Sequence, residues 1–381
     1  MTQDAPAGGR LHILELQTQF GVGGITRHVL SLRDWMRGRG HTVTLGGTPA
    51  AWAGPETEHD FLDLPTKFVS ADGGGSLPMR LFQVARGAWV LRRWLKANRV
   101  DLIHAHESAP ALVANLARMG TGIPLAVTYH GSEPERIAAF GGIASKADLV
   151  ITPSHASASD LARIGGVPED KLKVIGLGVS PAPDDSADEI AALRKELLGD
   201  GEVLVITVAR LVHQKGVDIL IDVVARLIRD HPGLRFVVAG DGPDEGRLKD
   251  LARTRGVNGH LRFLGRVNRP HLYLRASDLF LLTSRWEALP FTIVEAFQAG
   301  VPAVAAACSG VVELIDDQVG AVVPIGDVDA TAEAVKRIVT DGELLNSMGQ
   351  AALTKSRLDR FDPDWVHHQF EETYFTLAGR S

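Results

Sequence analysis

Two glutamates lie eight positions apart in the stretch SRWEALPFTIVEAFQAG, residues 284–300. Glu287 precedes Pro290, and Glu295 follows it. An ionised carboxylate accepts several hydrogen bonds from neighbouring hydroxyl groups, so this pair could hold a ligand that carries hydroxyls at both ends. The alternative is that Glu287 caps a helix and Glu295 faces solvent, and the spacing alone leaves both interpretations open.

Pro290 predicts a helix that begins near its own position, because proline suits the first helical residue. The backbone amides of Phe291 and Thr292 would then point out of the helix end, where the helix dipole favours a phosphate. Glu295 would lie about 7–8 Å further along the helix axis. A diphosphate at this helix end would have Glu287 beside it for a sugar and Glu295 for a ribose.

A cationic pair occurs in VARLVHQKG, residues 208–216, after the first predicted strand of the second half of the chain. Arg210 is expected at the C-terminal end of that strand, and Lys215 at the start of the next helix. Two cations beside a helix N-terminus can neutralise a diphosphate without a metal ion and stabilise charge on a departing phosphate. An exposed surface pair is the ordinary alternative.

A glycine-rich turn, QFGVGGITRHV at residues 19–29, is predicted between the first strand and the first helix. Such a turn lets the backbone approach a phosphate closely. The third glycine of a G-x-G-x-x-G dinucleotide motif is missing, because that position is Thr26, and the chain contains no G-x-x-x-x-G-K-[ST] run. The pattern disfavours a dehydrogenase and a P-loop protein, while a plain strand-to-helix turn stays open.

Histidines occur at two predicted strand ends. His104 and His106 share one face of a strand, a spacing that zinc sites use, but no further cysteine or histidine nearby completes a ligand set. We therefore predict no metal. His106 is expected to line the ligand-binding side of the sheet. His130, followed by Gly131, is expected to face a ligand and to donate a hydrogen bond to a sugar hydroxyl or a leaving-group oxygen. A packed histidine is the alternative for His106, and a loop histidine bonded to the backbone is the alternative for His130.

Short apolar strands that alternate with helical segments would position these residues. The predicted strands cover 11–16, 41–45, 101–106, 124–130, 148–152 and 172–176, then 202–209, 234–240, 260–265, 278–283, 302–307 and 320–325. This alternation implies parallel sheets with right-handed crossovers. A stretch rich in proline, aspartate and serine at 180–188 is typical of a linker. We predict an α/β chain of two Rossmann-like, doubly wound domains, 1–180 and 181–362, that face a central cleft.

The composition is that of a globular protein, with 45% hydrophobic and 23% charged residues among 381. A net charge of −6 gives no basis for a nucleic-acid partner. The single cysteine, Cys308, excludes an intrachain disulfide and suits a reducing compartment. The sequence shows no apolar signal core and no run long enough to span a bilayer, so we expect a cytoplasmic protein.

A basic helix with tryptophans is predicted at 78–99, where Trp89 and Trp94 lie among arginines and lysine. Such a helix can lie on an anionic membrane surface, which gives a secondary expectation of peripheral contact with the inner face of the membrane. The alternative is a helix that packs its apolar face on the sheet and solvates its basic side.

With these motifs the chain resembles the retaining glycosyltransferases of the GT-B fold, glycosyltransferase family 4. The matching pieces follow the family's order along nearly the whole chain: GVGGITRHV, HAH, TYHG, TPS, RLVHQKG, GDGP, LGRV and SRWEALPFTIVEAFQAGVPAVA. Three usual glycines are replaced, by Ala209 before the arginine, by Ala288 after the first glutamate and by Ser309 before Gly310. These small-for-small changes would at most narrow the donor pocket.

The resemblance implies a role for individual residues. Catalytic roles would fall to His130, Arg210, Lys215 and Glu287. The donor site would comprise Gly23, Gly24, Arg210, Lys215, Arg266, Val267, Glu287, Leu289, Phe291, Thr292 and Glu295. Candidates on the acceptor side are His106 and Arg27. The resemblance also implies that a C-terminal helix in 363–381 crosses back onto the first domain.

We therefore predict a metal-independent hexosyltransferase without a cofactor. It would move a sugar from a UDP- or GDP-sugar to a glycan, lipid-linked or small-molecule acceptor, with retention at the anomeric carbon. No carboxylate is clearly placed as a covalent nucleophile, which favours a front-face mechanism in which the leaving phosphate helps to take the acceptor's proton. Two alternatives stay open: a 2-epimerase of nucleoside-diphosphate sugars on the same fold, and a non-catalytic subunit that binds sugar nucleotides.

Overall fold

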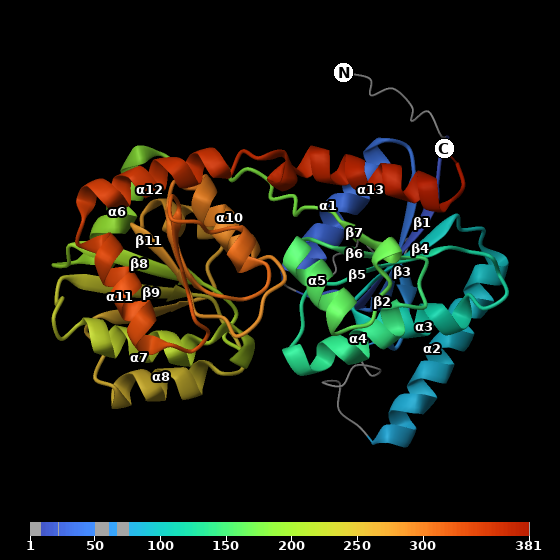
Figure 1. The fold of residues 1–381 in the computed structure, drawn as a ribbon, viewed down its shortest axis with the longest axis horizontal. Helices are drawn as coiled ribbons and strands as arrows, with labels where there is room; N and C mark the ends of the chain where they lie inside the picture. The colour runs from blue at the N-terminus through green and yellow to red at the C-terminus, as the bar shows by residue number, and fades with distance from the viewer. Residues whose placement is uncertain (1–8, 22, 50–60, 67–75, 381) are drawn as a thin grey trace. The chain divides into compact units, whose positions relative to one another are not determined.

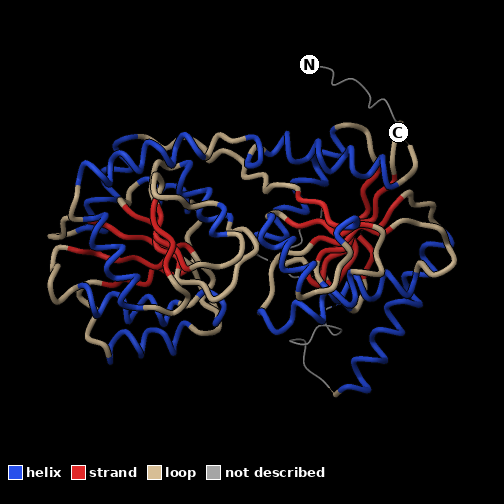
Figure 2. The backbone as a smooth tube through the Cα atoms, in the orientation of Figure 1, coloured by secondary structure: helices blue, strands red, loops and turns tan. Residues whose placement is uncertain are grey.

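The computed structural model describes residues 9–21, 23–49, 61–66 and 76–380. The chain divides into two compact units, Met1–Gly178 with Pro363–Ser381 and Val179–Asp362. Each unit is built on one parallel β-sheet with helices on both of its faces (Figures 1 and 2). The predicted class, α/β with two Rossmann-like doubly wound domains, is confirmed.

The first unit contains a seven-stranded sheet with the order β3-β2-β1-β4-β5-β6-β7. Its strands are β1 (His12–Gln19), β2 (Thr42–Thr48), β3 (Phe61–Asp63), β4 (Leu102–His106), β5 (Leu125–Thr128), β6 (Leu149–Thr152) and β7 (Leu172–Val174). The chain builds outward from β1 to β3 and then returns to place β4 on the other side of β1. Ligands of open α/β sheets bind at such a switch point, beyond the carboxyl ends of the strands.

The described residues of this unit form the α-helices α1 (Gly24–Gly38), α2 (Leu77–Ala97), α3 (Ser108–Ala117), α4 (Ile137–Ala144), α5 (His155–Arg163) and α13 (Pro363–Leu377). The last of them returns to the first unit after the whole second unit and packs against α1. The indole Nε1 of Trp35 donates to Asp364 over 3.1 Å, and the Arg39 guanidinium contacts Glu371 over 2.7 Å. The predicted crossing of the C-terminal helix onto the first domain is confirmed.

The second unit contains a six-stranded sheet with the order β10-β9-β8-β11-β12-β13, so its switch point lies between β8 and β11. Its strands are β8 (Val203–Val208), β9 (Leu234–Ala239), β10 (Leu261–Gly265), β11 (Leu279–Leu282), β12 (Ala303–Ala306) and β13 (Gly320–Val323). Its helices are α6 (Ala187–Leu198), α7 (Val217–Leu227), α8 (Glu245–Thr254), α9 (Pro270–Arg275), α10 (Phe291–Gln298), α11 (Val328–Val339) and α12 (Gly342–Lys355).

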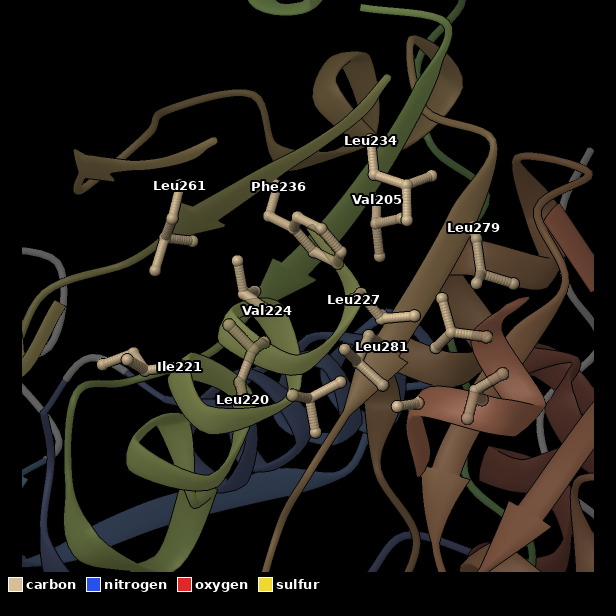
Figure 3. Packing of buried hydrophobic residues seen from close by; sticks show 14 of the residues in the cluster. Val205, Leu220, Ile221, Val224, Leu227, Leu234, Phe236, Leu261, Leu279 and Leu281 are labelled. Atoms are coloured by element: carbon tan, nitrogen blue, oxygen red, sulfur yellow. The ribbon is translucent and has the colours of Figure 1, made fainter. Parts of the chain in front are cut away.

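The second sheet packs apolar side chains against helix α7. Helix α7 presents Leu220, Ile221 and Val224 at helical spacing, and these pack against Val205 and Phe236 of the sheet (Figure 3). Each of these side chains is at most 2% exposed. Burial of one such side chain stabilises the fold by roughly 1.5–3 kcal/mol. This core fixes the strand ends from which the loops of the candidate site emerge.

Every strand predicted from the apolar runs is present in the structure, and the three-residue edge strand β3 was missed. The predicted linker at 180–188 is anchored within the second unit. The Asp185 carboxylate contacts Arg269, and it accepts a hydrogen bond from Arg275 over 2.7 Å. Ser186 and Glu189 then form a capping box that starts α6.

Candidate active site

Lys215 and Glu287 form an ion pair at the switch point of the second sheet. Lys215 follows β8 and Glu287 follows β11, and these neighbouring strands flank the point where the strand order reverses. The Lys215 Nζ lies 2.5 Å from the Glu287 Oε1, and the two side chains are 18% and 8% exposed. A cation and an anion thus meet where an open α/β sheet binds its ligand.

The loop that carries Lys215 is fastened to the strand end that precedes Glu287. Lys215 ends a short 3₁₀ helix, His213–Lys215, and Gly216 follows with φ of 60°. A Cβ atom at Gly216 would lie 2.0 Å from the carbonyl oxygen of Thr283, so only glycine fits there. The Thr283 hydroxyl donates to the Gly216 carbonyl over 2.9 Å. The sequence had placed Lys215 at the start of the next helix, which instead begins at Val217.

Glu287 is held by its own loop as well as by Lys215. The buried hydroxyl of Ser284 donates to the same Oε1 atom over 2.7 Å. The thiol of Cys308 donates to the Ser284 carbonyl over 3.2 Å, and burial, with a contribution from the Glu287 charge, raises the pKa of Cys308 to about 12. A Cβ atom at Gly310 would lie 1.4 Å from the Ala288 carbonyl oxygen, so the loop after β12 presses directly on this segment.

Helix α10 begins at Phe291, one residue later than predicted. Pro290 is the N-cap, with an extended ψ of 117°, and is not the first helical residue. The amides of Phe291 and Thr292 therefore belong to the first turn, whose N–H groups have no partner inside a helix. Glu295 lies about 6 Å further along the axis and is half-buried. Leu289, just before the proline, is buried.

The remaining predicted donor residues of the second unit lie at the same edge of the sheet. Arg210 follows β8 by two positions, and its side chain is exposed. Arg266 and Val267 come directly after β10, an edge strand that β9 separates from β8. In the strand order, Arg210 therefore lies nearer to Lys215 and Glu287 than Arg266 and Val267 do.

The predicted residues of the first unit also lie near its switch point. Gly23 and Gly24 are exposed at the N-terminus of α1, and Arg27 is exposed one turn later. His130 follows β5 and is half-buried. His106 ends β4, but its ring is fully buried, which leaves it no surface against which an acceptor could lie.

His106 belongs instead to a buried cluster that the sequence analysis missed. Its Nε2 atom lies 2.9 Å from the Glu15 Oε2 atom, and its Nδ1 atom lies 2.9 Å from the Nε2 atom of His130. Glu15 lies on β1 and is 1% exposed. One signal in the sequence was available: a carboxylate inside the otherwise apolar run LHILEL has to find a buried partner.

The same carboxylate contacts two further groups. The Tyr374 hydroxyl, on α13, donates to the Glu15 Oε1 atom over 2.9 Å. The His104 Nδ1 atom lies 2.6 Å from that hydroxyl and 3.1 Å from the Glu15 Oε2 atom. His104 also contacts the Thr128 hydroxyl through Nε2 over 2.7 Å. The Glu15 side chain, which projects from β1, is therefore contacted by residues of both β4 and α13.

Burial and mutual proximity shift the pKa values in this cluster. Burial alone would raise the pKa of Glu15, but His104 and His106 hold it well below its usual range. Burial lowers the pKa of His106 to about 4, with the charge of His104 contributing. Burial, and then the neighbouring histidines, lower the pKa values of His28 and His130 well below the ordinary range. Burial and the Glu15 charge raise the pKa of Tyr374.

Glu15, His104 and His106 also offer ligand atoms within 4.8 Å of one another, a grouping that can hold a metal ion. Each of these atoms already makes a hydrogen bond inside the protein. These contacts form a hydrogen-bond network, and the absence of a metal ion remains a prediction.

Two family models match the chain. The model described as glycosyl transferases group 1 matches residues 188–355, and the model described as glycosyltransferase family 4 matches residues 22–182. An uncharacterized glycosyltransferase of Methanocaldococcus jannaschii is 30% identical over 267 residues, which cover 65% of this chain and 68% of that protein. The glycogen synthase of Mycobacterium tuberculosis is 27% identical over 376 residues, which cover 90% and 88%.

An exopolysaccharide phosphotransferase of Streptomyces coelicolor is 38% identical over 174 residues, but that match covers 45% of this chain and 18% of the relative. Among solved structures, the sucrose-phosphate synthase of Thermosynechococcus elongatus has a TM-score of 0.82 at 20% identity and covers 98% of this chain and 100% of its own. HepE of Anabaena, in complex with UDP and glucose, has a TM-score of 0.80 at 23% identity and covers 96% and 100%. The chain belongs to glycosyltransferase family 4 and is a glycosyltransferase of the GT-B fold.

Proposed function

We propose that this enzyme transfers a hexosyl unit from a UDP- or GDP-sugar to a glycan, lipid-linked or small-molecule acceptor, with retention at the anomeric carbon and without a metal ion. The observation that carries the proposal is the Lys215–Glu287 ion pair at the switch point of the second sheet. It joins a group that neutralises phosphate to a group that accepts from sugar hydroxyls.

The contacts support a division of labour within this pair. Both described side-chain contacts of Glu287 use Oε1, which accepts from Lys215 and Ser284. A sugar hydroxyl would donate to Oε2. When the donor is bound, the Lys215 ammonium would pair with the diphosphate. Arg210 and the first-turn amides of α10 would donate further hydrogen bonds to it. The three cationic or N–H groups would stabilise the charge that develops on the leaving phosphate, which is the main catalytic task in this chemistry.

The contacts of the second unit also support the front-face mechanism. Glu287, the buried carboxylate of the ion pair, is committed through Oε1 to two hydrogen bonds, which suits an acceptor group better than a covalent nucleophile. The leaving phosphate would then help to take the proton of the acceptor hydroxyl on the same face of the sugar. The bond between the anomeric carbon and the phosphate oxygen would break, and the bond to the acceptor oxygen would form, on the same face of the sugar, which retains the anomeric configuration.

The relatives support a sugar-nucleotide donor without selecting its base. HepE is described in complex with UDP and glucose, and other relatives are named glycogen synthase and phosphatidyl-myo-inositol mannosyltransferase. Arg266 and Val267 would contact the base through main-chain atoms. Their side chains therefore do not indicate which base is bound. UDP- and GDP-sugars therefore both stay in the proposal.

A thermal-shift panel tests the donor. UDP, GDP, UDP-glucose, UDP-N-acetylglucosamine and GDP-mannose are each added to the full-length chain, since a ligand that binds the folded state raises its apparent stability. Lys215→Ala should reduce the shift, because the diphosphate loses one of its cationic partners. Lys355→Ala is the matched control, because Lys355 is also 18% exposed and pairs with Asp316 over 2.6 Å far from the site in sequence. An equal shift in Lys215→Ala and in the unmodified chain contradicts the proposal.

An assay of the bound donor without an acceptor separates the alternatives. A transferase leaves the sugar nucleotide intact or releases free sugar slowly. A 2-epimerase would yield an epimer of the donor, which proton NMR of the anomeric signals detects directly. A donor that binds but is never consumed with glycan, lipid or small-molecule acceptors would favour the non-catalytic subunit.

Exposed apolar side chains on α2 support a peripheral membrane contact as part of this function. Among the described residues, no helix is long and apolar enough to cross a membrane. On α2, Leu81, Phe82 and Trp89 are each at least 60% exposed, and the Arg93 guanidinium lies 5.7 Å from the Trp89 ring centroid. Apolar and basic groups together suit the surface of an anionic bilayer.

Vesicle flotation tests this contact. The full-length chain should float with vesicles of phosphatidylglycerol and phosphatidylcholine, and Phe82→Glu should remain at the bottom of the gradient. Met119→Glu is the control, because Met119 is also exposed, at 63%, but lies outside α2. Equal flotation of the two variants, or none with the unmodified chain, removes the membrane from the proposal.

A further inference from the structure

A row of hydrogen bonds leads from a buried carboxylate to the half-buried histidine at the carboxyl edge of the first sheet. The Glu15 Oε2 and His106 Nε2 atoms lie 2.9 Å apart, and the His106 Nδ1 and His130 Nε2 atoms lie 2.9 Å apart. The rings of His106 and His130 stack at 5.2 Å between centroids. Three residues on three consecutive strands or strand ends of the sheet, β1, β4 and β5, are therefore joined in series.

The carboxylate at one end of this row determines which ring nitrogens carry protons. A carboxylate only accepts hydrogen bonds, so the Nε2 atom of His106 carries a proton and donates it to Glu15. In a neutral His106 ring, Nδ1 is then the acceptor, and the Nε2 atom of His130 has to donate to it. In a neutral His130 ring, Nδ1 is consequently left with a lone pair.

Tyr374 and His104 also fix Glu15 as an acceptor of hydrogen bonds. The single proton of the Tyr374 hydroxyl goes to the Glu15 Oε1 atom. The His104 Nδ1 atom, 2.6 Å from the Tyr374 oxygen, then has to donate. Both carboxylate oxygens therefore accept, one from α13 and the other from β4.

We propose that Glu15 and His106 are positioning residues that fix His130 in its Nε2–H tautomer, so that the Nδ1 atom of His130 accepts a hydrogen bond from a hydroxyl of the bound sugar substrate. This inference rests on the proposed function for its ligand. It reverses the direction expected from the sequence, in which His130 donates. A phosphate oxygen, which only accepts, would find no donor on the neutral ring.

The surroundings keep both rings neutral. The titratable groups that face the row from the packed elements are Glu15 on β1, His28 on α1, His104 and His106 on β4, His130 after β5, and His367 and Tyr374 on α13. Burial, together with the neighbouring histidines, lowers the pKa of His106 to about 4 and that of His130 well below its ordinary range. His130 is therefore a poor base, which suits a group that orients a hydroxyl.

Nitrogen-15 spectra of the histidine rings test the tautomer without any substrate. The full-length chain is labelled at histidine, and His106→Asn and His130→Asn assign the signals. At neutral pH, both rings should show a protonated Nε2 and a bare Nδ1. A protonated Nδ1 on His130, or a doubly protonated His106, overturns the proposal. This measurement decides the question even if a variant at Glu15 does not fold.

Glu15→Gln gives the second arm. A glutamine has one accepting oxygen, whereas Glu15 accepts through two, so at least one neighbour has to reverse its hydrogen bond. The His130 ring should then show a mixture of tautomers. Glu371→Gln is the matched control, because Glu371 accepts from the equally buried His41 over 2.9 Å within the same unit and outside the row. Retention of a single His130 tautomer in both Glu15→Gln and Glu15→Leu, the second of which has no accepting oxygen to face His106, contradicts the proposal.

Kinetics on the donor found in the thermal-shift panel give the third arm. Glu15→Gln should lower kcat/KM by about tenfold or more, the worth of one hydrogen bond, while having less than about a twofold effect in a His130→Asn background. A merely structural role would give the same loss in both backgrounds and would overturn the proposal. If no sugar nucleotide binds or reacts, the proposed function fails, whereas the ring-nitrogen spectra still decide the tautomer.

Discussion

The ammonium of Lys215 and the carboxylate of Glu287 are separated by 72 positions in the chain and by 2.5 Å in space. They meet because β8 and β11 are neighbours in the sheet although β9 and β10 lie between them in sequence. The two motifs that carry them, R-x4-K and E-x7-E, are thereby parts of one site.

Lys215→Ala should reduce turnover more than it weakens acceptor binding, because the ammonium would stabilise charge on the leaving phosphate. We expect kcat to fall by about a hundredfold or more. Initial rates at saturating donor measure this effect, and Lys355→Ala should stay within about twofold of the unmodified enzyme. Equal rates in the two variants would count against a phosphate role for Lys215.

Loss of Glu287 should destabilise the second unit, because Lys215 and Ser284 would both lose their acceptor at a nearly buried position. We expect Glu287→Ala to lower the free energy of unfolding by about 1–3 kcal/mol. Urea denaturation of Glu287→Ala, Lys215→Ala and the double variant should give a coupling energy of about 0.5–3 kcal/mol. Strict additivity of the two single changes would mean that the ion pair contributes nothing in solution.

Gly216→Ala should disrupt the site through the backbone. Its Cβ atom would have to occupy a point 2.0 Å from the Thr283 carbonyl oxygen, at a φ of 60°. We expect a loss of about 2–4 kcal/mol in unfolding free energy and a loss of donor binding. Gly256→Ala is the control, because Gly256 has a similar φ of 70° but no atom within 4 Å of the added Cβ, so its loss should be about 1 kcal/mol.

Acid should destabilise the first unit from the histidine range downward. The pKa of His106 is lowered to about 4, so between its ordinary value and about 4 the unfolded chain binds a proton that the folded chain refuses. Stability is therefore complete above the unfolded pKa and falls as the pH drops, by about 3 kcal/mol in total for His106. The lowered pKa values of His28 and Glu15 act in the same direction.

Urea midpoints from about pH 7.5 down to about pH 5 measure this acid loss. His28→Leu should make the unfolding free energy depend less steeply on pH, by the equivalent of about one proton. The reason is that the chain then has no His28 ring to take up a proton on unfolding. A stability curve that stays level over this range, or that rises toward acid, would contradict the assignment of neutral buried rings.

Local patterns were sufficient to predict every strand except β3 and to place Arg210, Lys215 and Glu287 in loops that follow strands, while their role in a donor site stays a prediction. Apolar runs mark buried strands, and the carboxylates and cations stood at the loops that follow them. The boundary at Pro290 was placed one residue early, because proline is compatible with both the cap and the first helical position. The three-residue β3 offered too short a pattern to recognise.

Contacts between distant segments could not be predicted from such patterns. That His106 is buried follows from the elements that surround β4 on both sides, and no local feature of HAH records them. Glu15 meets Tyr374, 359 positions away, only because α13 returns to the first sheet. The order of strands in each sheet decides which side chains meet, and it is a property of the whole fold.

The first unit is assembled from two stretches of the chain, Met1–Gly178 and Pro363–Ser381, with the entire second unit translated between them. On the ribosome, its opening strand would carry the Glu15 charge without the tyrosine hydroxyl that later covers it. The surroundings of Glu15 are therefore complete only after α13 has been synthesised, and a circular permutant that begins with Pro363–Leu377 would complete them earlier during synthesis.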